Sequence, residues 1–558
     1  MKKSVSLKSG FLNKLKPYWP ILVILFVSLV LLRSFFKPGF PETHDGQSHL
    51  ARLANFHLAT IDRHFPIRWA RNLNYKFGYP VFNFNYFTPY VLALIPGQLG
   101  LSFEASFKLV FIFSLFFGGL FWYLLLKKKF GSIPGLVAGL FYISAPYQLV
   151  NILIRGSVGE IVALGLFPFL FWSIDWLVDK PSRLSFLTTT LGLATLALTH
   201  NISFFFGVPI LGLFALMLIW LKKDWHRLRP VIVSFIFSVG LTLFFWIPAL
   251  LEKKFTNLDS IEMSYEYIKH FPSLGQLIYS PWNYGFSVEG LKDGFTFQLG
   301  PFHWLIGLLS IAVLIKTYLK SKKLNWWGIF FTLIFIVSII FMMPITLPIW
   351  KILPMVRYIQ FPWRLLGFSI ISVTVLAGFL AKKLPKISFI LVFGAIIYSS
   401  LIAKPGGWFN WNDDFYYNFP FSSSIKGLNM PKWFTLEVDQ RSSFGNRNMF
   451  DLEGITSFKE FSWKTQKHIY QLNASRETKI FERTAYFPGW QVTIDDQPTQ
   501  IDYQAKQYPG VISFTVPQGE HLIETSFTEA TPARRLGNAL SVVSLISFLS
   551  FLYFKILL

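Results

Sequence analysis

The chain contains no cysteine, and it has few charged residues for its length of 558. The absence of cysteine excludes disulfide bonds, thiolate metal sites and cysteine nucleophiles. Charged residues make up 15% of the chain and hydrophobic residues 53%, whereas an average soluble domain has roughly 25% charged residues. A chain with so little polar surface is not a soluble enzyme, and its composition is typical of a protein embedded in a bilayer.

Acidic residues are the scarcer of the two charges. The chain has 29 Asp and Glu against 52 Lys and Arg, which gives a formal net charge of +23. In an apolar chain, a small set of mainly positive charges is typical of a membrane protein with basic loops on one face. We therefore expect a membrane, and no nucleic acid, as the partner of the basic surface.

Long apolar stretches are the main feature of the sequence. A helix needs about 20 mostly apolar residues to cross a bilayer, and twelve stretches of roughly this kind occur along the chain. They predict a polytopic α-helical membrane protein with about twelve transmembrane helices, at 18–35, 105–126, 133–150, 161–178, 184–199, 201–221, 231–251, 297–315, 324–346, 365–381, 387–403 and 537–554.

Clusters of lysine and arginine predict the orientation. They precede the first stretch and follow the second, sixth, eighth and tenth. With twelve spans all of these clusters fall on one side, which the positive-inside rule assigns to the cytoplasm. We therefore predict a multi-pass protein of the cell membrane with both termini in the cytoplasm. A thirteenth span at Tyr86–Leu101 would invert the later clusters, so we predict an interfacial helix there.

The pattern divides the chain into three parts. The predicted transmembrane domain covers 1–403 and includes a long first external loop, 36–104, with juxtamembrane helices. Within 404–535 the pattern changes to short runs of β type, such as Val511–Val516, between turn residues. We predict an extracytoplasmic β-sandwich-like domain there, tethered by a C-terminal transmembrane helix at 536–558.

The first external loop opens with His44, Asp45 and His49. Over 47–66 apolar residues recur with helical spacing, which predicts an amphipathic helix on the membrane surface. Asp45 is either the N-cap of this helix, a role that Thr43 could also take, or a general base. With His49 one helical turn away, it could instead ligate a divalent cation, Mg²⁺ or Mn²⁺. The cofactor therefore stays open.

Charged residues also occur in predicted outer loops, where such charges are costly and point to function. Arg155 and Glu160 stand close together in a Gly-containing turn. They either pair to fix the turn, or they contact a phosphate and supply a second acid. The loop between the ninth and tenth stretches carries Lys351, Arg357 and Arg364 without an acid. These bases either anchor lipid headgroups or bind a donor phosphate.

Three further residues are candidates for substrate contact. His200, at the predicted outer surface, is either a helix cap or a hydrogen-bonding partner of the substrate. Tyr79 and Tyr86 belong to an aromatic and Pro-rich patch, whose rings either stack on sugar faces or form an aromatic belt at the interface.

These features together resemble a known group of proteins. An acidic residue soon after the first span, an amphipathic helix and the patch Gly78–Tyr90 are similar to GT-C-fold integral-membrane glycosyltransferases. The pattern more closely resembles bacterial membrane proteins labelled "6-pyruvoyl-tetrahydropterin synthase-related". The motif Tyr486–Trp490 also resembles YfhO-like membrane proteins. Other supporting segments are Ile67–Trp69, Arg155–Glu160 and Thr199–Asn201.

The resemblance implies a GT-C-like fold and a glycosyltransferase that moves a sugar from a lipid-linked polyprenyl-phosphate donor to a glycan or protein acceptor outside the cytoplasm. Asp45 matches the acidic residue that commonly acts in that group as the base toward the acceptor. We therefore predict that Asp45 and Glu160 are catalytic, with Glu160 orienting an acceptor group or a metal. The candidate substrate-binding residues are His44, His49, Arg155, His200, Lys351, Arg357, Arg364, Tyr79 and Tyr86.

Two other functions fit the same features. One is a transporter or flippase of a lipid-linked glycan, in which the basic residues follow an anionic headgroup. The other is a non-catalytic membrane protein of envelope assembly, whose β-domain binds partners.

Overall fold

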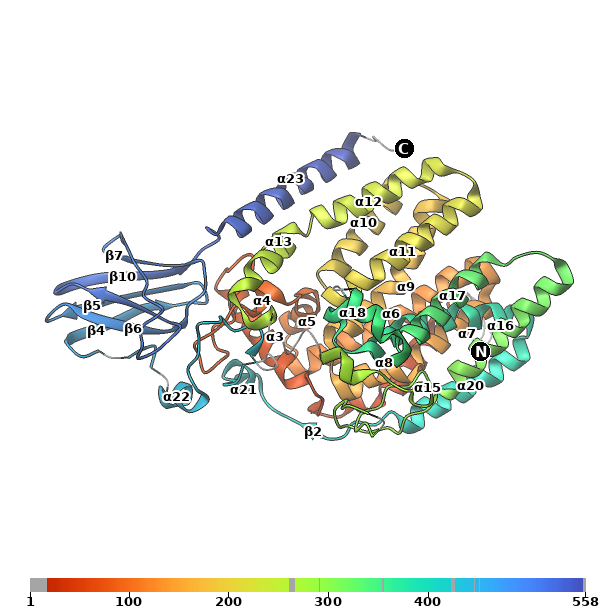
Figure 1. Cartoon of the computed structure of the whole chain (residues 1–558), viewed down its shortest axis with the longest axis horizontal. Helices are drawn as coiled ribbons and strands as arrows, with labels where there is room; N and C mark the ends of the chain where they lie inside the picture. The colour runs from red at the N-terminus through yellow and green to blue at the C-terminus, as the bar shows by residue number, and fades with distance from the viewer. Residues whose placement is uncertain are drawn as a thin grey trace, which may run out of the picture.

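The computed structural model describes residues 18–259, 266–290, 292–353, 356–422, 427–445, 447–450 and 452–554. A large helical part and a smaller β-rich part lie side by side (Figure 1). After the β-rich part, the last helix, α23 (Pro532–Phe554), returns to the helical part and packs along α12 (Leu228–Gly240) and α13 (Leu243–Glu252).

Seven helices in the described residues are long and apolar enough to cross a membrane. Three more candidates are helix pairs that are bent at a short break, by 42°, 58° and 84°. The structure therefore has seven to ten candidate spans. The single helices are α6 (Phe103–Phe130), α9 (Val158–Asp179), α11 (Asn201–Lys222), α16 (Pro301–Ser321), Pro362–Lys383, which contains α19 (Leu366–Lys383), α20 (Pro385–Ile402) and α23. The bent pairs are Ser132–Ile143 with Pro146–Arg155, Trp225–Gly240 with Leu243–Phe255, and Trp326–Phe341 with Pro344–Ile352.

Every predicted stretch contains a helix, but two of these helices are short. α2 (Trp19–Leu31) has 13 residues and α10 (Arg183–Ala197) has 15, against the roughly 17–25 that a spanning helix needs. The count of twelve spans therefore stays a prediction, because it depends on these two helices and on reading each bent pair as one span.

The first loop folds into short helices. These are α3 (Gly46–Ile61), α4 (Val81–Phe84) and α5 (Thr88–Gln98). With 11 residues, α5 is too short to span a membrane. Most residues of α3 are buried, because α5, α6 and α21 (Asp413–Tyr417) pack around it. The sequence pattern did not predict this cover, and a place for α3 at the membrane surface stays a prediction.

Two antiparallel sheets make up the β-rich part, with strand orders β4-β5-β10-β7-β8 and β3-β6-β9. The buried carboxylate of Glu482, on β6, accepts hydrogen bonds from Tyr470 of β5 and Thr525 of β10. The two sheets therefore face each other. The strands are β3 (Met449–Phe450), β4 (Ile455–Trp463), β5 (Lys467–Ala474), β6 (Thr478–Ala485), β7 (Trp490–Ile494), β8 (Gln497–Thr499), β9 (Val511–Val516) and β10 (Gly519–Phe527).

Short elements complete the chain. β1 (Phe40–Pro41) pairs with β2 (Trp408–Phe409), which ties the first loop to the segment after α20. The remaining α-helices among the described residues are α7 (Ser132–Ile143), α8 (Pro146–Val150), α15 (Leu274–Ile278), α17 (Trp326–Phe341), α18 (Leu347–Ile352) and α22 (Val438–Ser443).

A buried ion-pair network joins the β-rich part to the helical part. Arg68 Nε lies 2.6 Å from Glu529 Oε1, and Arg534 Nη2 lies 3.1 Å from Glu252 Oε2. The Asn83 side chain links the two pairs, because it accepts a hydrogen bond from Arg68 and donates one to Glu252. The side chains of both arginines are at most 2% exposed. Removing a partner carboxylate therefore leaves a buried charge without its counter-ion.

We predict that Glu529→Gln lowers the free energy of unfolding by about 2–3 kcal/mol, because a neutral amide cannot balance Arg68. Thermal unfolding of the purified protein in detergent measures this. Glu453→Gln is the matched control, since Glu453 pairs with Arg476 on the surface, where the two side chains are 88% and 65% exposed. The control should change stability by less than about 0.5 kcal/mol. Equal effects of the two substitutions would contradict the assignment.

Candidate functional site

A broken helix end places Arg155 against Glu160. After α8 the chain forms one turn of π-helix, η2 (Asn151–Arg155), and then reverses at Gly156, which has a φ of +64°. α9 starts directly afterwards, at Val158. Such π-helical turns are common at functional sites, because they re-aim side chains. Here the turn brings Arg155 Nη1 to 2.6 Å from Glu160 Oε2.

The pair is held by further buried groups. The Tyr147 hydroxyl donates to Glu160 Oε1 at 2.5 Å, and Asn151 accepts a hydrogen bond from Arg155. The Arg155 guanidinium also lies 4.9 Å from the centre of the Trp363 ring. Since the side chains of the pair are only 6% and 5% exposed, these contacts fix both charges in one geometry.

The first loop docks on this turn through its backbone. The N–H of His44 donates to the Ile154 carbonyl, and the N–H of Asp45 donates to the Arg155 carbonyl, both at 2.9 Å. The Asp45 side chain accepts no capping hydrogen bond at the start of α3. Thr43 Oγ1 instead accepts the N–H of Gly46. Of the two capping candidates, the structure therefore uses Thr43, and the half-buried Asp45 carboxylate is left for another role.

Arg364 reaches the same place from another part of the chain. It lies in a 3-10 turn, Pro362–Leu365, before α19. Its Nε is 3.8 Å from Glu160 Oε2, and its Nη1 donates to the Ile359 carbonyl at 2.8 Å. The Nε atom is buried and has no hydrogen-bond partner in the described part of the chain. A buried guanidinium N–H without an acceptor is costly, and an anionic oxygen would remove that cost.

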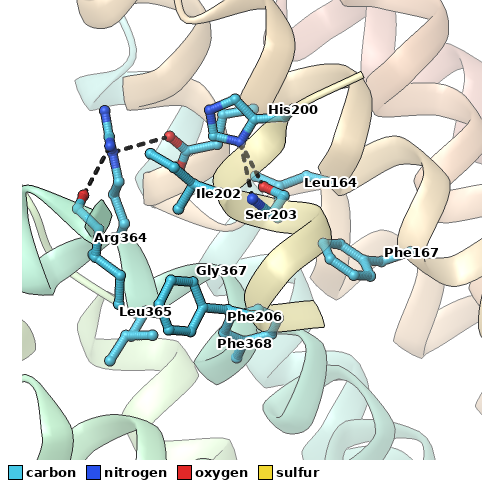
Figure 2. Close-up of a pocket in the computed structure, with 12 residues that line it drawn as sticks. Leu164, Phe167, His200, Ile202, Ser203, Phe206, Arg364, Leu365, Gly367 and Phe368 are labelled. Carbon is cyan, nitrogen blue, oxygen red and sulfur yellow. Dashed lines mark hydrogen bonds and ion pairs between the residues drawn. The ribbon is translucent and has the colours of Figure 1, made fainter. Parts of the chain in front are cut away.

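His200 stands beside this pair, at the N-cap of α11. Its Nδ1 lies 2.7 Å from Ser203 Oγ and 3.3 Å from the N–H of Ser203 (Figure 2). Burial, together with the charges of Arg364 and Arg155, lowers the pKa of His200 to about 3, although Glu160 opposes this. His200 is therefore neutral. Of its two predicted roles, the structure shows that of a helix cap.

Tyr86, Tyr90 and His49 complete the cluster on the side of the first loop. The Tyr86 ring meets the His200 ring edge to face, with centres 5.6 Å apart. It also covers Gly159, where a Cβ would lie 2.2 Å from the Tyr86 ring. His49 Nδ1 lies 2.9 Å from the Tyr90 hydroxyl. Burial, and then the charge of Arg52, hold the pKa of His49 well below its usual value.

A small, mostly apolar pocket borders the charged cluster, between α9, α11 and α19; its empty volume of about 400 Å³ includes space open to solvent. Glu160, His200 and Arg364 are its polar lining residues, together with Ser203. Figure 2 shows phenylalanine side chains around the rest of this space. The other lining residues are Leu164, Phe167, Ile202, Phe206, Ile359, Leu365, Gly367 and Phe368. The geometry suits a ligand with an anionic head and an apolar tail.

Four predicted residues lie elsewhere or differ in environment. Lys351 is exposed on α18 and does not line the pocket. The Arg357 side chain lies outside the described residues. Tyr79 is completely buried, so its ring faces are covered and cannot stack on a sugar, contrary to one of the two predictions. His44 stacks on Phe286 and contacts the Tyr284 carbonyl.

The predicted metal ligands do not form a larger group. Within the described ranges, no three His, Asp or Glu side chains lie close enough together to hold a metal ion. His49 Nδ1 is engaged by Tyr90, and both Glu160 oxygens are engaged by Tyr147 and Arg155.

Sequence reasoning missed several members of the cluster: Arg52, Tyr90, Tyr147, Asn151 and Trp363. Asn151 and Arg52 carried a usable signal, because a polar residue at the end of an apolar stretch and a buried charge on an amphipathic helix both need partners. The aromatic residues carried none, since tyrosine and tryptophan occur throughout this chain.

Comparison with known proteins gives the family. A family model described as "6-pyruvoyl-tetrahydropterin synthase related domain; membrane protein" matches residues 84–411, which is more than half of the chain. The chain belongs to this family. The predicted resemblance to this family and the prediction of a membrane protein are thereby confirmed. The part that matches the PTPS-related family contains Arg155, Glu160, His200 and Arg364, whereas Asp45 precedes it.

A relative in Lactococcus lactis subsp. cremoris (strain MG1363), named only as an uncharacterized protein, is 25% identical over 238 residues. The match covers 41% of this chain and 39% of that relative. The chain thus spans well under half the length of this curated relative.

We predict that Gly156→Ala destabilises the protein by about 3 kcal/mol, since a Cβ would lie 2.4 Å from Thr43 Oγ1 and would add backbone strain. Gly100→Ala is the matched control: Gly100 has a φ of +88° and no atom within 4 Å of an added Cβ. It should cost only the strain, about 1–2 kcal/mol. Thermal unfolding in detergent measures both, and an equal loss would show that the first loop does not pack on this turn.

Proposed function

We propose that this member of the PTPS-related family is an integral-membrane glycosyltransferase with a GT-C-like fold. In this proposal it moves a sugar from a polyprenyl-phosphate donor to a glycan or protein acceptor outside the cytoplasm. One observation carries the proposal: Arg155, Glu160 and Arg364 gather beside Asp45 where an apolar pocket begins.

The donor phosphate fits the guanidinium groups. Arg364 has a buried Nε–H without an acceptor, and Arg155 lies within the same cluster. Guanidinium groups bind phosphate through paired, charge-assisted hydrogen bonds. The first isoprene units of the donor would lie along Leu164, Phe167 and the facing phenylalanines of the pocket.

The transfer itself needs one base and one stabilised leaving group. Asp45 accepts the proton of the acceptor hydroxyl, and the oxygen attacks the anomeric carbon of the sugar. The bond from this carbon to the phosphate oxygen breaks, and the lipid phosphate leaves with the electron pair. Arg155 and Arg364 balance the charge that develops on it. Because the oxygens of Glu160 are held by Tyr147 and Arg155, Glu160 is a positioning residue in this scheme and does not act on the acceptor.

The proposed function also implies where each domain lies relative to the membrane. We infer a transmembrane domain at 1–403, an extracytoplasmic β-domain at 404–535 that presents the acceptor, and a final helix at 536–558. Both termini would be cytoplasmic. Lys128, paired with Asp175 and Asp179, would lie on the cytoplasmic face.

A transporter of lipid-linked glycans is the second candidate. Broken helices at a binding site are common in transporters, and the second helix of the bent pair Ser132–Ile143 with Pro146–Arg155 ends at the site, just before the reversal at Gly156.

We predict that Asp45→Asn lowers turnover at least a hundredfold, about the contribution of a general base, while stability is kept. The assay uses proteoliposomes, a panel of radiolabelled polyprenyl-phosphate sugars and a cell-envelope extract as acceptor. Asp414→Asn, at an exposed position on α21, is the matched control and should keep full activity. Unchanged product formation in Asp45→Asn would end the catalytic assignment and favour transport.

We predict that Arg364→Gln weakens binding of geranylgeranyl phosphate about tenfold to a hundredfold, the value of one or two hydrogen bonds from a charged donor. Isothermal titration in detergent measures the dissociation constant. Lys351→Gln removes a cation from the same outer loop, but from its exposed surface, and should change affinity less than twofold. If both substitutions weakened binding alike, the two bases would be headgroup anchors.

A further inference from the structure

We propose that a second pocket, at the far end of the helical part, binds the headgroup of an anionic membrane phospholipid. The end of α11, the turn from α16 to α17 and the last residues of α19 line this pocket. Its empty volume of about 730 Å³ includes space open to solvent. The turn between α16 and α17 lies at the opposite end of the molecule from the β-rich part (Figure 1). The inference does not depend on the proposed function.

The lining combines cations, small polar groups and apolar side chains. Lys323 and Lys383 are its charged members, and none of the described residues that line the pocket is acidic. The polar lining residues are Thr317, Ser321 and Asn325, and the apolar ones are Leu221, Leu324, Trp326, Trp327 and Phe379. An anionic phospholipid presents the complementary groups, a phosphate beside a glycerol and the first acyl carbons. Basic pockets between transmembrane helices are known sites for such headgroups.

A tight turn brings Lys323 to the pocket. α16 ends at Ser321, and Lys322 then has a φ of +54°, in the left-handed region that reverses the chain after a helix. The N–H of Lys323 donates to Ser321 Oγ at 3.3 Å. The turn therefore holds the backbone of Lys323 close to the end of α16, and the ammonium group is presented next to the pocket lining.

The start of α17 adds hydrogen-bond donors at the same place. Asn325 is the N-cap of α17, and its side chain accepts the N–H of Gly328. The N–H groups of Trp326 and Trp327 have no acceptor within the described ranges. Free N–H groups at a helix N-terminus favour an anion. They add to the attraction that the two lysines provide.

Lys323 and Lys383 have no acidic partner in the part of the chain that the structure describes. The acids near the end of α9, Asp175 and Asp179, pair with other lysines. Asp224, after α11, pairs with the arginine three residues further on. The clusters that follow α16 and α19 thus have more positive charge than the acids of the protein balance. Anionic headgroups at the membrane surface supply that counter-charge.

Aromatic and apolar groups favour a lipid over a free anion. Trp326 meets Trp220 edge to face, with ring centres 4.6 Å apart, and Lys129 Nζ lies 5.0 Å from the centre of the Trp327 ring. Trp220 and Leu324 are 46% and 48% exposed. Tryptophan is typical of the membrane interface. Free phosphate uses the cations alone, whereas a phospholipid also covers this apolar surface.

The pocket is remote from the candidate site, although the same helices reach both. α11 starts beside His200 and ends at Lys222, and α19 starts after Arg364 and ends at Lys383. The 18 residues of α19 span about 27 Å, at about 1.5 Å per residue. Substitutions in the pocket therefore leave the candidate site in place, so lipid binding is testable apart from any sugar transfer.

The absence of cysteine allows a probe at one position. Ser321→Cys in the full-length chain, labelled with bimane and studied in detergent, reports on the pocket that Ser321 lines. Dioctanoyl phosphatidylglycerol should change the fluorescence in a saturable way, and zwitterionic dioctanoyl phosphatidylcholine should not. Inorganic phosphate should leave the signal unchanged. An equal response to the zwitterionic lipid, saturation by inorganic phosphate, or no response to phosphatidylglycerol would overturn the proposal.

Paired substitutions in the labelled protein test the two lysines. Lys323→Gln with Lys383→Gln should weaken phosphatidylglycerol binding about tenfold to thirtyfold. Lys316→Gln with Lys320→Gln is the matched control, since it removes the same charge from exposed positions of α16 outside the pocket, and it should change affinity less than twofold. Equal weakening by the two pairs would show a general attraction by surface charge and overturn the proposal.

A conservative pair guards against a folding defect. Lys323→Arg with Lys383→Arg keeps both charges and should bind phosphatidylglycerol within about threefold of wild type, while thermal unfolding checks that each variant is folded. If the glutamine pair does not fold, Lys383→Gln alone is compared with Lys320→Gln, and only the former should weaken binding, by about threefold to fivefold. Equal affinities of these two variants would contradict the inference. Lipid binding in a protein that makes no glycoside would keep it and refute the proposed transfer.

Discussion

The site depends on one buried ion pair, Arg155 with Glu160. Two charges at this depth are tolerated only if each is paired and hydrogen-bonded. That requirement explains the parts around them: the π-helical turn and Gly156, which bring the two side chains together, and Tyr147, which occupies the remaining carboxylate oxygen. The same turn exposes two carbonyl groups, and these receive the first loop with Asp45.

The pair stands between two environments. On one side Arg364 and His200 open to an apolar pocket, and on the other the first loop carries Asp45 and His49. α3 starts at this point and spans about 24 Å, at about 1.5 Å per residue, before it ends at Asp62. The Asp62 carboxylate accepts hydrogen bonds from Thr465 and Arg71. One helix therefore connects the site to the turn between β4 and β5, and the β-rich part is anchored to the loop that bears Asp45.

The sequence predicted the charged members of the cluster because charges in apolar surroundings are costly and therefore conspicuous. Arg155, Glu160, Arg364 and His200 were found this way, although they come from three separate segments. Lys351 carried the same signal as Arg364, but the 84° bend before α18 leaves it on the surface. The pattern of charges alone does not contain that bend.

Other features of the structure cannot be predicted from the sequence pattern. Hydropathy does not show where a helix breaks. Two bent pairs, Ser132–Ile143 with Pro146–Arg155 and Trp225–Gly240 with Leu243–Phe255, are therefore each predicted as one straight span, and Leu347–Ile352 is predicted as a loop. The hydroxyl groups of Tyr90 and Tyr147 act through contacts with residues 41 and 13 positions away, and nothing local marks them among 22 tyrosines. Burial of α3 was also missed, because its cover comes from α5, α6 and α21, which follow it in the chain.

The most direct test of the account is a structure of the protein in lipid nanodiscs with geranylgeranyl phosphate, determined by electron cryo-microscopy. The account predicts phosphate density in contact with Arg364 and Arg155, within reach of Asp45, and a lipid chain that runs along Leu164, Phe167 and Phe368. Phosphate density at the exposed loop of Lys351, with the pocket and the charged cluster empty, would contradict it.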